Sequence, residues 1–235
     1  TVSAGYTAAS TFVLAISSWY LLKGRDVEFA KRSFQVAAAF GFASICSTIV
    51  LGDESGYSVG LAQQTKLAAI EAMWETEPAP ADFNLIAGIN EAEQKNDWHV
   101  SIPYAMGIIG TRSLDKEIIG IHDIKALNEK RIINGIQAVS LLDQLREDRT
   151  NPQTIAQFEK VKKDLGFGLL LKKYTDDVTK ATPEMIKKAT DDTIPPIFPM
   201  FWSFRIMVGL GFLMLAMYVV ALWSSVKGNF MQKPW

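Results

Sequence analysis

The stretch FWSFRIMVGLGFLMLAMY occupies residues 201–218 and contains a single charged side chain, that of Arg205. About 20 apolar residues, rising about 1.5 Å each in a helix, are enough to cross the hydrocarbon core of a bilayer. Trp202 and Trp223 bracket this apolar region, at the level where amphipathic rings meet the lipid headgroups. The stretch therefore predicts a membrane helix with one arginine near its start.

Two earlier runs have a similar character. Residues 1–22 and 33–52 carry no charge, and neither do residues 206–226. Core helices of a large soluble protein are the alternative explanation. Three such runs in 235 residues, with Trp19 and Tyr20 closing the first, favour three membrane crossings.

The charged residues are segregated between these runs. Residues 53–192 hold 17 Lys+Arg and 23 Asp+Glu, a net charge of −6. From totals of 24 and 25, the remaining 7 basic and 2 acidic residues give +5. An acidic polar region repels phosphate, so nucleic-acid binding is disfavoured.

The basic residues predict the orientation. The connection KGRDVEFAKR, residues 23–32, has four basic side chains, and the tail after the third run has Lys227 and Lys233. Three crossings put both segments on one side, which the positive-inside rule identifies as the cytoplasm. The long polar stretch between the second and third runs is then extracytoplasmic.

The polar stretch carries helix signals. Residues 123–148 have apolar side chains at helical spacing, with Gly135 as a weak point. Asn151 followed by Pro152, and Thr182 followed by Pro183, predict two further helix starts.

Other parts of the stretch read differently. The segment WHVSIPYAMGIIG, residues 98–110, is the best candidate for extended chain, and Pro195 and Pro196 forbid a continuous helix back into the membrane.

These observations predict an all-α membrane protein with three transmembrane helices and a large, mainly helical extracytoplasmic loop. The expected divisions are residues 1–52, two transmembrane helices with a basic connection; residues 53–196, the loop; and residues 197–235, the third helix and its tail. The chain opens inside an apolar helix without an initiator methionine or a basic leader, so we expect a piece of a longer membrane protein. Cys46 is expected to pack as a small apolar side chain.

Few residues carry recognisable chemistry. The sequence has no G-x-S-x-G, Walker A or C-x-x-C motif, and His99 and His122 have no partners at metal-ligand spacing. The apolar segment KLAAIEAMW contains one base, Lys66, and one acid, Glu71. It is either a site for an amphiphilic ligand or an ordinary interfacial helix. On a helix the two charges point about 140° apart, so a direct ion pair is not expected.

Arg205 and the neighbouring methionines allow two interpretations. Arg205 either extends towards the membrane surface or pairs with a buried anion. Met200, Met207 and Met214 recur every seven residues, a spacing typical of core packing, but a thioether is also an axial ligand for haem iron. An arginine near such a ligand could pair with haem propionates.

Four motifs together identify a family resemblance. GDESGY (52–57), TKLAAIEAMWETEPAP (65–80), LGFGLLLKKY (165–174) and FWSFRIMVGLGF (201–212) resemble subunit I of the cytochrome bd-type quinol oxidases in its long quinol-loop form, over the whole chain. The resemblance implies a bacterial cytoplasmic-membrane enzyme that oxidises ubiquinol or menaquinol, reduces oxygen to water and contributes to the proton gradient. It also implies a second large subunit and a very small one.

The resemblance assigns roles to single residues. Lys66 and Glu71 fall on the quinol-oxidising pair, Met207 on an axial ligand of the low-spin haem b, and Arg205 on a partner of its propionates. Because residues 205 and 207 lie some 200° apart around a helix, both would serve one haem only if the helix end is distorted or the arginine wraps back.

The resemblance also places other haem groups outside this chain. The second ligand of the low-spin haem is implied to be a histidine immediately before Thr1, and the ligands of the high-spin haem b and haem d lie in other helices. The rival interpretation is a non-enzymatic membrane sensor or receptor whose extracytoplasmic domain binds a ligand.

Overall fold

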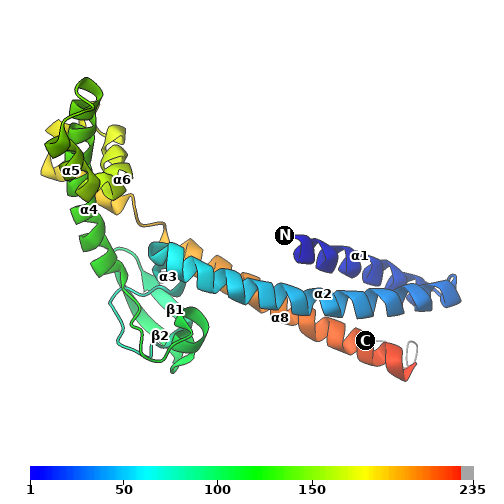
Figure 1. Ribbon diagram of the computed structural model, residues 1–235. Helices are drawn as coiled ribbons and strands as arrows, with labels where there is room; N and C mark the ends of the chain where they lie inside the picture. Colours follow the sequence, from blue (N-terminus) through cyan, green and yellow to red (C-terminus); the bar gives the residue numbers. More distant parts are fainter. Residues whose placement is uncertain (229–235) are drawn as a thin grey trace. The chain divides into compact units, whose positions relative to one another are not determined.

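The chain folds mainly into helices. The computed structural model describes residues 1–228, so the predicted basic residue Lys233 lies outside the described residues. One compact unit contains Thr1–Ser58 and the chain from Ser203 onward, and the second is Val59–Trp202. Figure 1 labels helices α1 to α6 and α8 and strands β1 and β2.

The elements follow in this order: α1 Val2–Lys23, α2 Val27–Ala62, α3 Gln64–Glu71, β1 Phe83–Asn90, β2 Lys95–Ile102, the π-helix η1 Gly107–Thr111, α4 Ile121–Glu147, α5 Pro152–Val161, the 3-10 helix η2 Lys162–Asp164, α6 Leu165–Leu169, the 3-10 helices η3 Leu170–Lys173 and η4 Val178–Lys180, α7 Pro183–Asp191 and α8 Ile197–Lys227.

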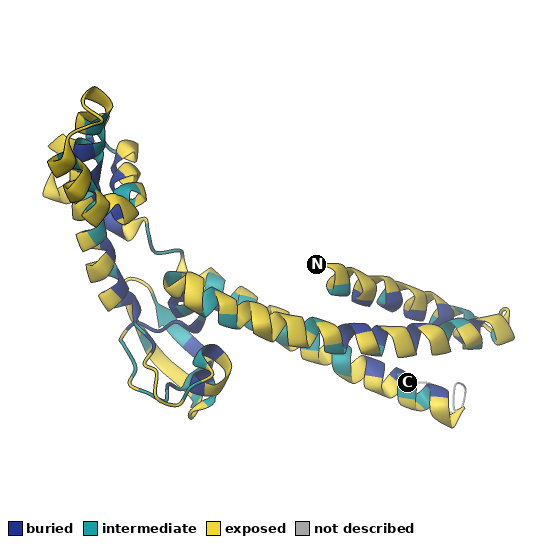
Figure 2. Ribbon diagram, in the orientation of Figure 1, coloured by how far each residue is buried: buried dark blue, intermediate teal, exposed yellow. Residues whose placement is uncertain are grey.

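Helices α2 and α8 are long and apolar enough to cross a membrane. In the most apolar 18-residue stretch of each helix, only 28% of the residues are buried in α2 and 11% in α8. The core helix of a soluble protein would be mostly buried. Figure 2 shows the exposed surface that these helices retain. Helix α1 is not among the helices found long and apolar enough to cross a membrane. Its 22 residues include six serines and threonines, which lower its mean hydropathy. The predicted crossing at residues 1–22 stays a prediction.

Tyr218 joins three helices of the first unit. Its ring on α8 is fully buried, and its hydroxyl donates to the carbonyl oxygen of Thr7 at 2.9 Å on α1. The same hydroxyl lies 2.8 Å from the hydroxyl of Thr11. On α2, Gly41 leaves the space that the ring fills, since a Cβ atom there would lie 2.0 Å from Tyr218. The polar hydroxyl is thereby satisfied inside an apolar core.

Helix α4 is the backbone of the second unit. It confirms the helix predicted over residues 123–148, and α5, α6 and α7 all pack against it. Gly135 does not interrupt it. A Cβ atom there would lie 2.2 Å from the backbone nitrogen of Gly168, so the two glycines let α4 and α6 approach closely. The buried residues Ile132, Leu171, Val178 and Ala189 form the core between these elements.

The predicted helix starts are confirmed by their caps. The Asn151 side chain accepts from the backbone N–H groups of Gln153 and Thr154, and Thr182 accepts from Met185 at 3.4 Å. Each cap satisfies an N–H group that has no partner within its helix. The prolines also act as expected, because α7 ends at Asp191 and α8 begins only at Ile197.

A β-hairpin is the main departure from the predicted all-α fold. Strands β1 and β2 pair antiparallel, with Ala87 opposite His99. The predicted extended segment is right for residues 98–102 but wrong beyond them, since residues 107–111 form the π-helix η1. Strand β1 is not among the predicted elements, because Asn84 and Gly88 interrupt the apolar pattern of its sequence.

Candidate functional site

Helix α3 carries the predicted base and acid. It is eight residues long and follows α2 after one non-helical residue, Gln63. Ala72 ends it in the left-handed conformation, with φ 51°, and the chain then turns back so that Met73 donates to the carbonyl of Ala68 at 2.9 Å. This is a helix-terminating turn usually made by glycine. Lys66 therefore lies in the first turn of α3 and Glu71 at its last residue.

The backbone after α3 is held at four successive carbonyl groups. The side chains of Asn84 and Asn96, on the hairpin, donate to the carbonyls of Glu71 and Ala72 at 3.1 and 2.9 Å. The next two carbonyls, of Met73 and Trp74, accept from the first amides of α4 at 2.9 and 3.0 Å. The unpaired amides at the start of α4 thus find partners in this segment. The hairpin and α4 together fix residues 71–74.

Gly120 is required at this junction. A Cβ atom there would lie 2.1 Å from the backbone carbon of Glu75, and its own N–H donates to the hydroxyl of Thr76 at 2.9 Å. The N-terminus of α4 can approach the segment after α3 only because residue 120 has no side chain.

Glu71 and Lys66 lie in different surroundings. Glu71 is 2% exposed and lies among the apolar residues of the largest core cluster, which includes Ala68, Met73 and Trp74. Lys66 is exposed. The structure does not bring the two charges into one cavity, in agreement with their spacing on a helix.

Lys66 lines a groove of about 950 Å³. The groove runs between α3, α4, the α5–α6 region and the start of α8. We call it the basic groove, because every charged side chain in its lining is basic: Lys66, Arg131 and Lys163. Its apolar lining includes Leu127 and Phe167.

Arg131 is fixed in the wall of this groove. Its Nε–H donates to the buried carboxylate of Asp164 at 2.9 Å, and its guanidinium carbon lies 4.0 Å from the centre of the Phe167 ring. Asn134 donates to the other oxygen of Asp164 at 3.0 Å. Burial alone would raise the pKa of Asp164, but these two hydrogen bonds and the charges of Arg131 and Lys163 hold it below its usual value.

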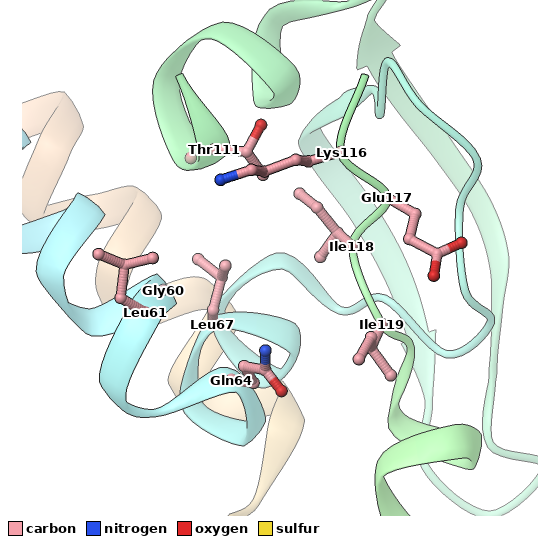
Figure 3. Close-up of a pocket in the computed structure, with 10 residues that line it drawn as sticks. Gly60, Leu61, Gln64, Leu67, Thr111, Lys116, Glu117, Ile118 and Ile119 are labelled. Carbon is pink, nitrogen blue, oxygen red and sulfur yellow. The ribbon is translucent and has the colours of Figure 1, made fainter. Parts of the chain in front are cut away.

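A second cavity, of about 170 Å³, lies against α3 as well. Figure 3 shows Leu61, Leu67 and Ile118 lining it, with Gln64 at the α3 side. The carboxylate of Glu117 points away from its centre. Neither cavity is lined by Glu71.

Arg205 and Met207 lie within the continuous helix α8. The helix includes Pro199 in its first turn and is regular through both residues, so the distorted helix end considered above is absent from residues 197–227. The guanidinium carbon of Arg205 lies 5.6 Å from the centre of the Phe204 ring. An arginine that serves the same group as Met207 must therefore reach around the helix.

The methionines of α8 differ in their environments. Met214 packs against the core of the first unit, and Met200 lines the basic groove of the second. Met207 is 59% exposed. Core packing explains Met214 but not Met207, whose side chain is largely exposed and can meet a ligand from outside the chain. A haem that takes one axial sulfur from this chain fits that exposure.

The two histidines differ in their contacts. The Nδ1 atom of His122 lies 2.9 Å from a carboxylate oxygen of Glu75, whereas its Nε2 atom is buried with no hydrogen-bond partner among the described residues. His99 lies opposite Ala87 in the register of the hairpin. Among residues 1–228, no group of three or more histidine, cysteine or acidic side chains is arranged to hold a metal ion.

Comparison with known proteins covers the whole chain. The family model described as cytochrome bd terminal oxidase subunit I matches residues 1–235. The chain is 39% identical over 235 residues to cytochrome bd-II ubiquinol oxidase subunit 1 of Escherichia coli, covering 100% of this chain and 46% of that protein. It is 23% identical over 224 residues to cytochrome bd ubiquinol oxidase subunit 1 of Bacillus subtilis, covering 95% of this chain and 36% of the relative.

A solved structure also matches. The bd oxidase from Geobacillus thermodenitrificans aligns with 96% of this chain and 54% of its own chain, at 17% identity and a TM-score of 0.47. The chain thus spans about half the length, or less, of the curated relatives it matches.

Proposed function

Since this chain belongs to the cytochrome bd terminal oxidase subunit I family, we propose that it is part of a respiratory oxidase that oxidises quinol, reduces oxygen to water and contributes to the proton gradient. The name of its Escherichia coli relative favours ubiquinol as the electron donor. The proposed assembly contains a second large subunit and a very small one, in the bacterial cytoplasmic membrane. The family match favours this enzyme over the sensor considered from the sequence.

The proposed contribution of this chain to quinol oxidation is centred on α3. Quinol oxidation releases two protons with two electrons, so a site needs a hydrogen-bond donor for the ring oxygen and a proton acceptor. Lys66 supplies the donor from the exposed first turn of α3, and Glu71 supplies the carboxylate at its end.

The observation that carries this proposal is the fixed backbone around Glu71. Four consecutive carbonyl groups are held by the hairpin and by α4, so the end of α3 is fixed from two sides. Such support is what a reacting side chain requires. Because the Glu71 carboxylate is covered, direct contact with a quinol beside Lys66 requires the end of α3 to move.

The chain's proposed contribution to haem binding lies on α8. Met207 would provide one axial sulfur to the low-spin haem b, and Arg205 would balance its propionates. When bound, that haem supplies one-electron transfer. The high-spin haem b and haem d would take their ligands from outside this chain.

The test uses the full-length oxidase complex. Lys66→Leu and Glu71→Gln should each lower the rate of quinol oxidation while leaving the haem content unchanged. Lys130→Leu and Glu147→Gln are matched controls, because both side chains are exposed on α4 and line neither cavity. Unchanged quinol kinetics in both α3 variants would refute the assignment.

A further inference from the structure

The charged side chains that line the basic groove are all positive. Lys66, Arg131 and Lys163 line it, and no acidic side chain does. Within residues 1–228, neither Lys66 nor Lys163 forms an ion pair. Asp164, buried behind Arg131, balances one of the three charges and leaves a net charge of +2. Because the rest of the polar unit is acidic overall, this local excess of positive charge is a distinct feature.

Arg131 is arranged to hold a second anion. Only its Nε–H is used by Asp164, and the stacking on Phe167 restricts the plane of the guanidinium group. The terminal N–H groups are free of other partners within residues 1–228. A guanidinium fixed in this way suits the oxygens of a phosphate, to which arginine can donate two parallel hydrogen bonds.

The groove is also apolar and exposed. Leu61, Leu127 and Leu170 line it and keep 65%, 46% and 41% of their surface exposed. Apolar side chains that are gathered in one groove and left uncovered mark a binding surface. The ligand therefore carries both an anionic group and an apolar part.

The groove adjoins two helices that are able to cross a membrane. Leu61 and Ala62 are the last residues of α2, and Met200 lies in the first turn of α8. A ligand held here is close to the ends of both candidate spans. Basic side chains beside membrane helices attract anionic lipid headgroups.

We propose that the basic groove binds an anionic phospholipid, with its phosphate between Lys163 and Arg131 and its chains against the exposed leucines. This inference goes beyond the proposed quinol chemistry. Lys66, the proposed quinol donor, lines the same groove, so the phosphate is assigned to Arg131 and Lys163 and not to Lys66. A neutral amphiphile would leave the excess charge unbalanced. An acidic segment of a partner protein would balance it, but the position beside the membrane helices favours a lipid.

The test labels the groove with a lipid probe. The intact oxidase complex is placed in phosphatidylcholine nanodiscs that contain a trace of photoactivatable phosphatidylglycerol, and labelled peptides are quantified. Peptides covering residues 163–170 should be labelled, and unlabelled phosphatidylglycerol should compete. Inorganic phosphate at the same concentration should not, which separates a lipid from a free anion.

Matched variants locate the phosphate. Lys163→Gln should raise the concentration of phosphatidylglycerol needed for half-maximal competition about fivefold, the factor that corresponds to about 1 kcal/mol per basic side chain. Lys160→Gln is the control, because Lys160 is exposed nearby on α5 but does not line the groove. Haem spectra verify that both variants assemble.

Four results would overturn the proposal. One is equal labelling by a phosphatidylcholine probe, and another is equal loss in the Lys160→Gln control. Absence of labelling would mean that polypeptide covers the groove in the complex. Competition by decylubiquinol as strong as that by phosphatidylglycerol would identify a quinol groove instead, which would support the proposed function while refuting the lipid.

Discussion

The side-chain amide of Asn84 donates a hydrogen bond of 3.1 Å to the main-chain carbonyl of Glu71, and both residues are buried. This contact joins a strand of the hairpin to the last residue of α3. It gives the hairpin a definite role, since β1 holds in place the segment that carries the proposed proton acceptor. In the proposed quinol site, Asn84 would therefore be a positioning residue rather than a catalytic one.

Replacing Asn84 by alanine should impair quinol oxidation. The Glu71 carbonyl would lose its donor inside the core, at a cost of about 1–3 kcal/mol, and the end of α3 would become less well fixed. We expect a lower kcat with unchanged low-spin haem absorbance, measured on the purified complex. Asn90→Ala is the control on the same strand. The half-buried Asn90 side chain bonds to Asp97 and to the backbone N–H of Glu93 within the hairpin, away from the segment after α3, so its loss should have little effect on kcat. Equal losses in both variants would argue against a positioning role.

The helices of the loop were predictable because their signals are local. The caps at Asn151 and Thr182 lie within three residues of the groups they bond. The repeating apolar residues of α4 likewise lie within one helix. The hairpin was missed because Asn84 and Gly88 interrupt the apolar pattern of β1, and its register depends on a partner strand.

The candidate site was predictable only in part. The motif places Lys66 and Glu71 on one short helix, and their angular separation follows from helix geometry. The supports at Asn84 and Asn96 lie 13 and 24 residues from the carbonyls they bond, so no local pattern reveals them. Gly135 illustrates the same limit. The missing side chain at residue 135 allows a close contact with Gly168, and the sequence alone does not identify that partner.

Gly41→Ala should destabilise the first unit. The added Cβ atom would lie 2.0 Å from the Tyr218 ring, and a fully buried ring has little room to shift. Overpacking of this kind costs about 1–3 kcal/mol. We expect a lower thermal transition for the complex in detergent. Gly5→Ala is the control, because nothing lies within 4 Å of its Cβ position, and an unchanged or higher transition is expected. An equal loss in the control would mean that the overlap with Tyr218 is not the cause.

The packing of α4 against α6 should weaken in acid. The pKa of the Asp164 carboxyl is held below its usual value in the folded chain. A depressed carboxyl pKa contributes stability above the unfolded-state pKa of about 3.9, and that stability is lost as the pH falls through the folded-state value. Hydrogen exchange of α4 and α6 amides should therefore be steady from pH 7 to 5, after correction for intrinsic rates, and should speed up below about pH 4.

Asp164→Asn provides the comparison for that experiment. The amide keeps a similar shape but does not titrate, so part of the acid-induced change should disappear. Asp148→Asn is the matched control, since Asp148 also has a lowered pKa, from hydrogen bonds with Thr150, but is exposed at the end of α4. If the two variants respond identically to pH, the buried cluster around Asp164 is not the source of the effect.

The proposed orientation predicts a labelling pattern. With Cys46 replaced by alanine, a cysteine at Val27 should react with an impermeant maleimide only from the cytoplasmic side. A cysteine at Gln153 should react only from the outside, and Gln153 is preferred to Asn151 because Asn151 caps α5. The basic connection before α2 and the positive-inside rule carry this expectation. The reverse pattern would place Lys66 and Glu71 on the cytoplasmic side and refute the orientation predicted from the basic segments.

Met207→Leu should alter the low-spin haem b in the full-length complex. Leucine keeps the volume of methionine but has no sulfur to ligate iron, and a side chain that is 59% exposed contributes little packing to this chain. We therefore expect a shifted or absent low-spin signal in the reduced-minus-oxidised spectrum. Met214 tests whether the change is specific, since it lies seven residues further along α8 and packs against the core of the first unit.

Met214→Leu should lower stability by less than about 1.5 kcal/mol and leave the haem spectrum unchanged, because leucine preserves the packing. Arg205→Gln distinguishes charge pairing from ligation. Loss of a propionate partner should shift the midpoint potential of the haem without removing its axial sulfur, so the spectrum should remain low-spin. If Met214→Leu abolishes the signal and Met207→Leu does not, the ligand lies on the packed side of α8. The exposure of Met207 would then reflect contact with lipid or a partner subunit.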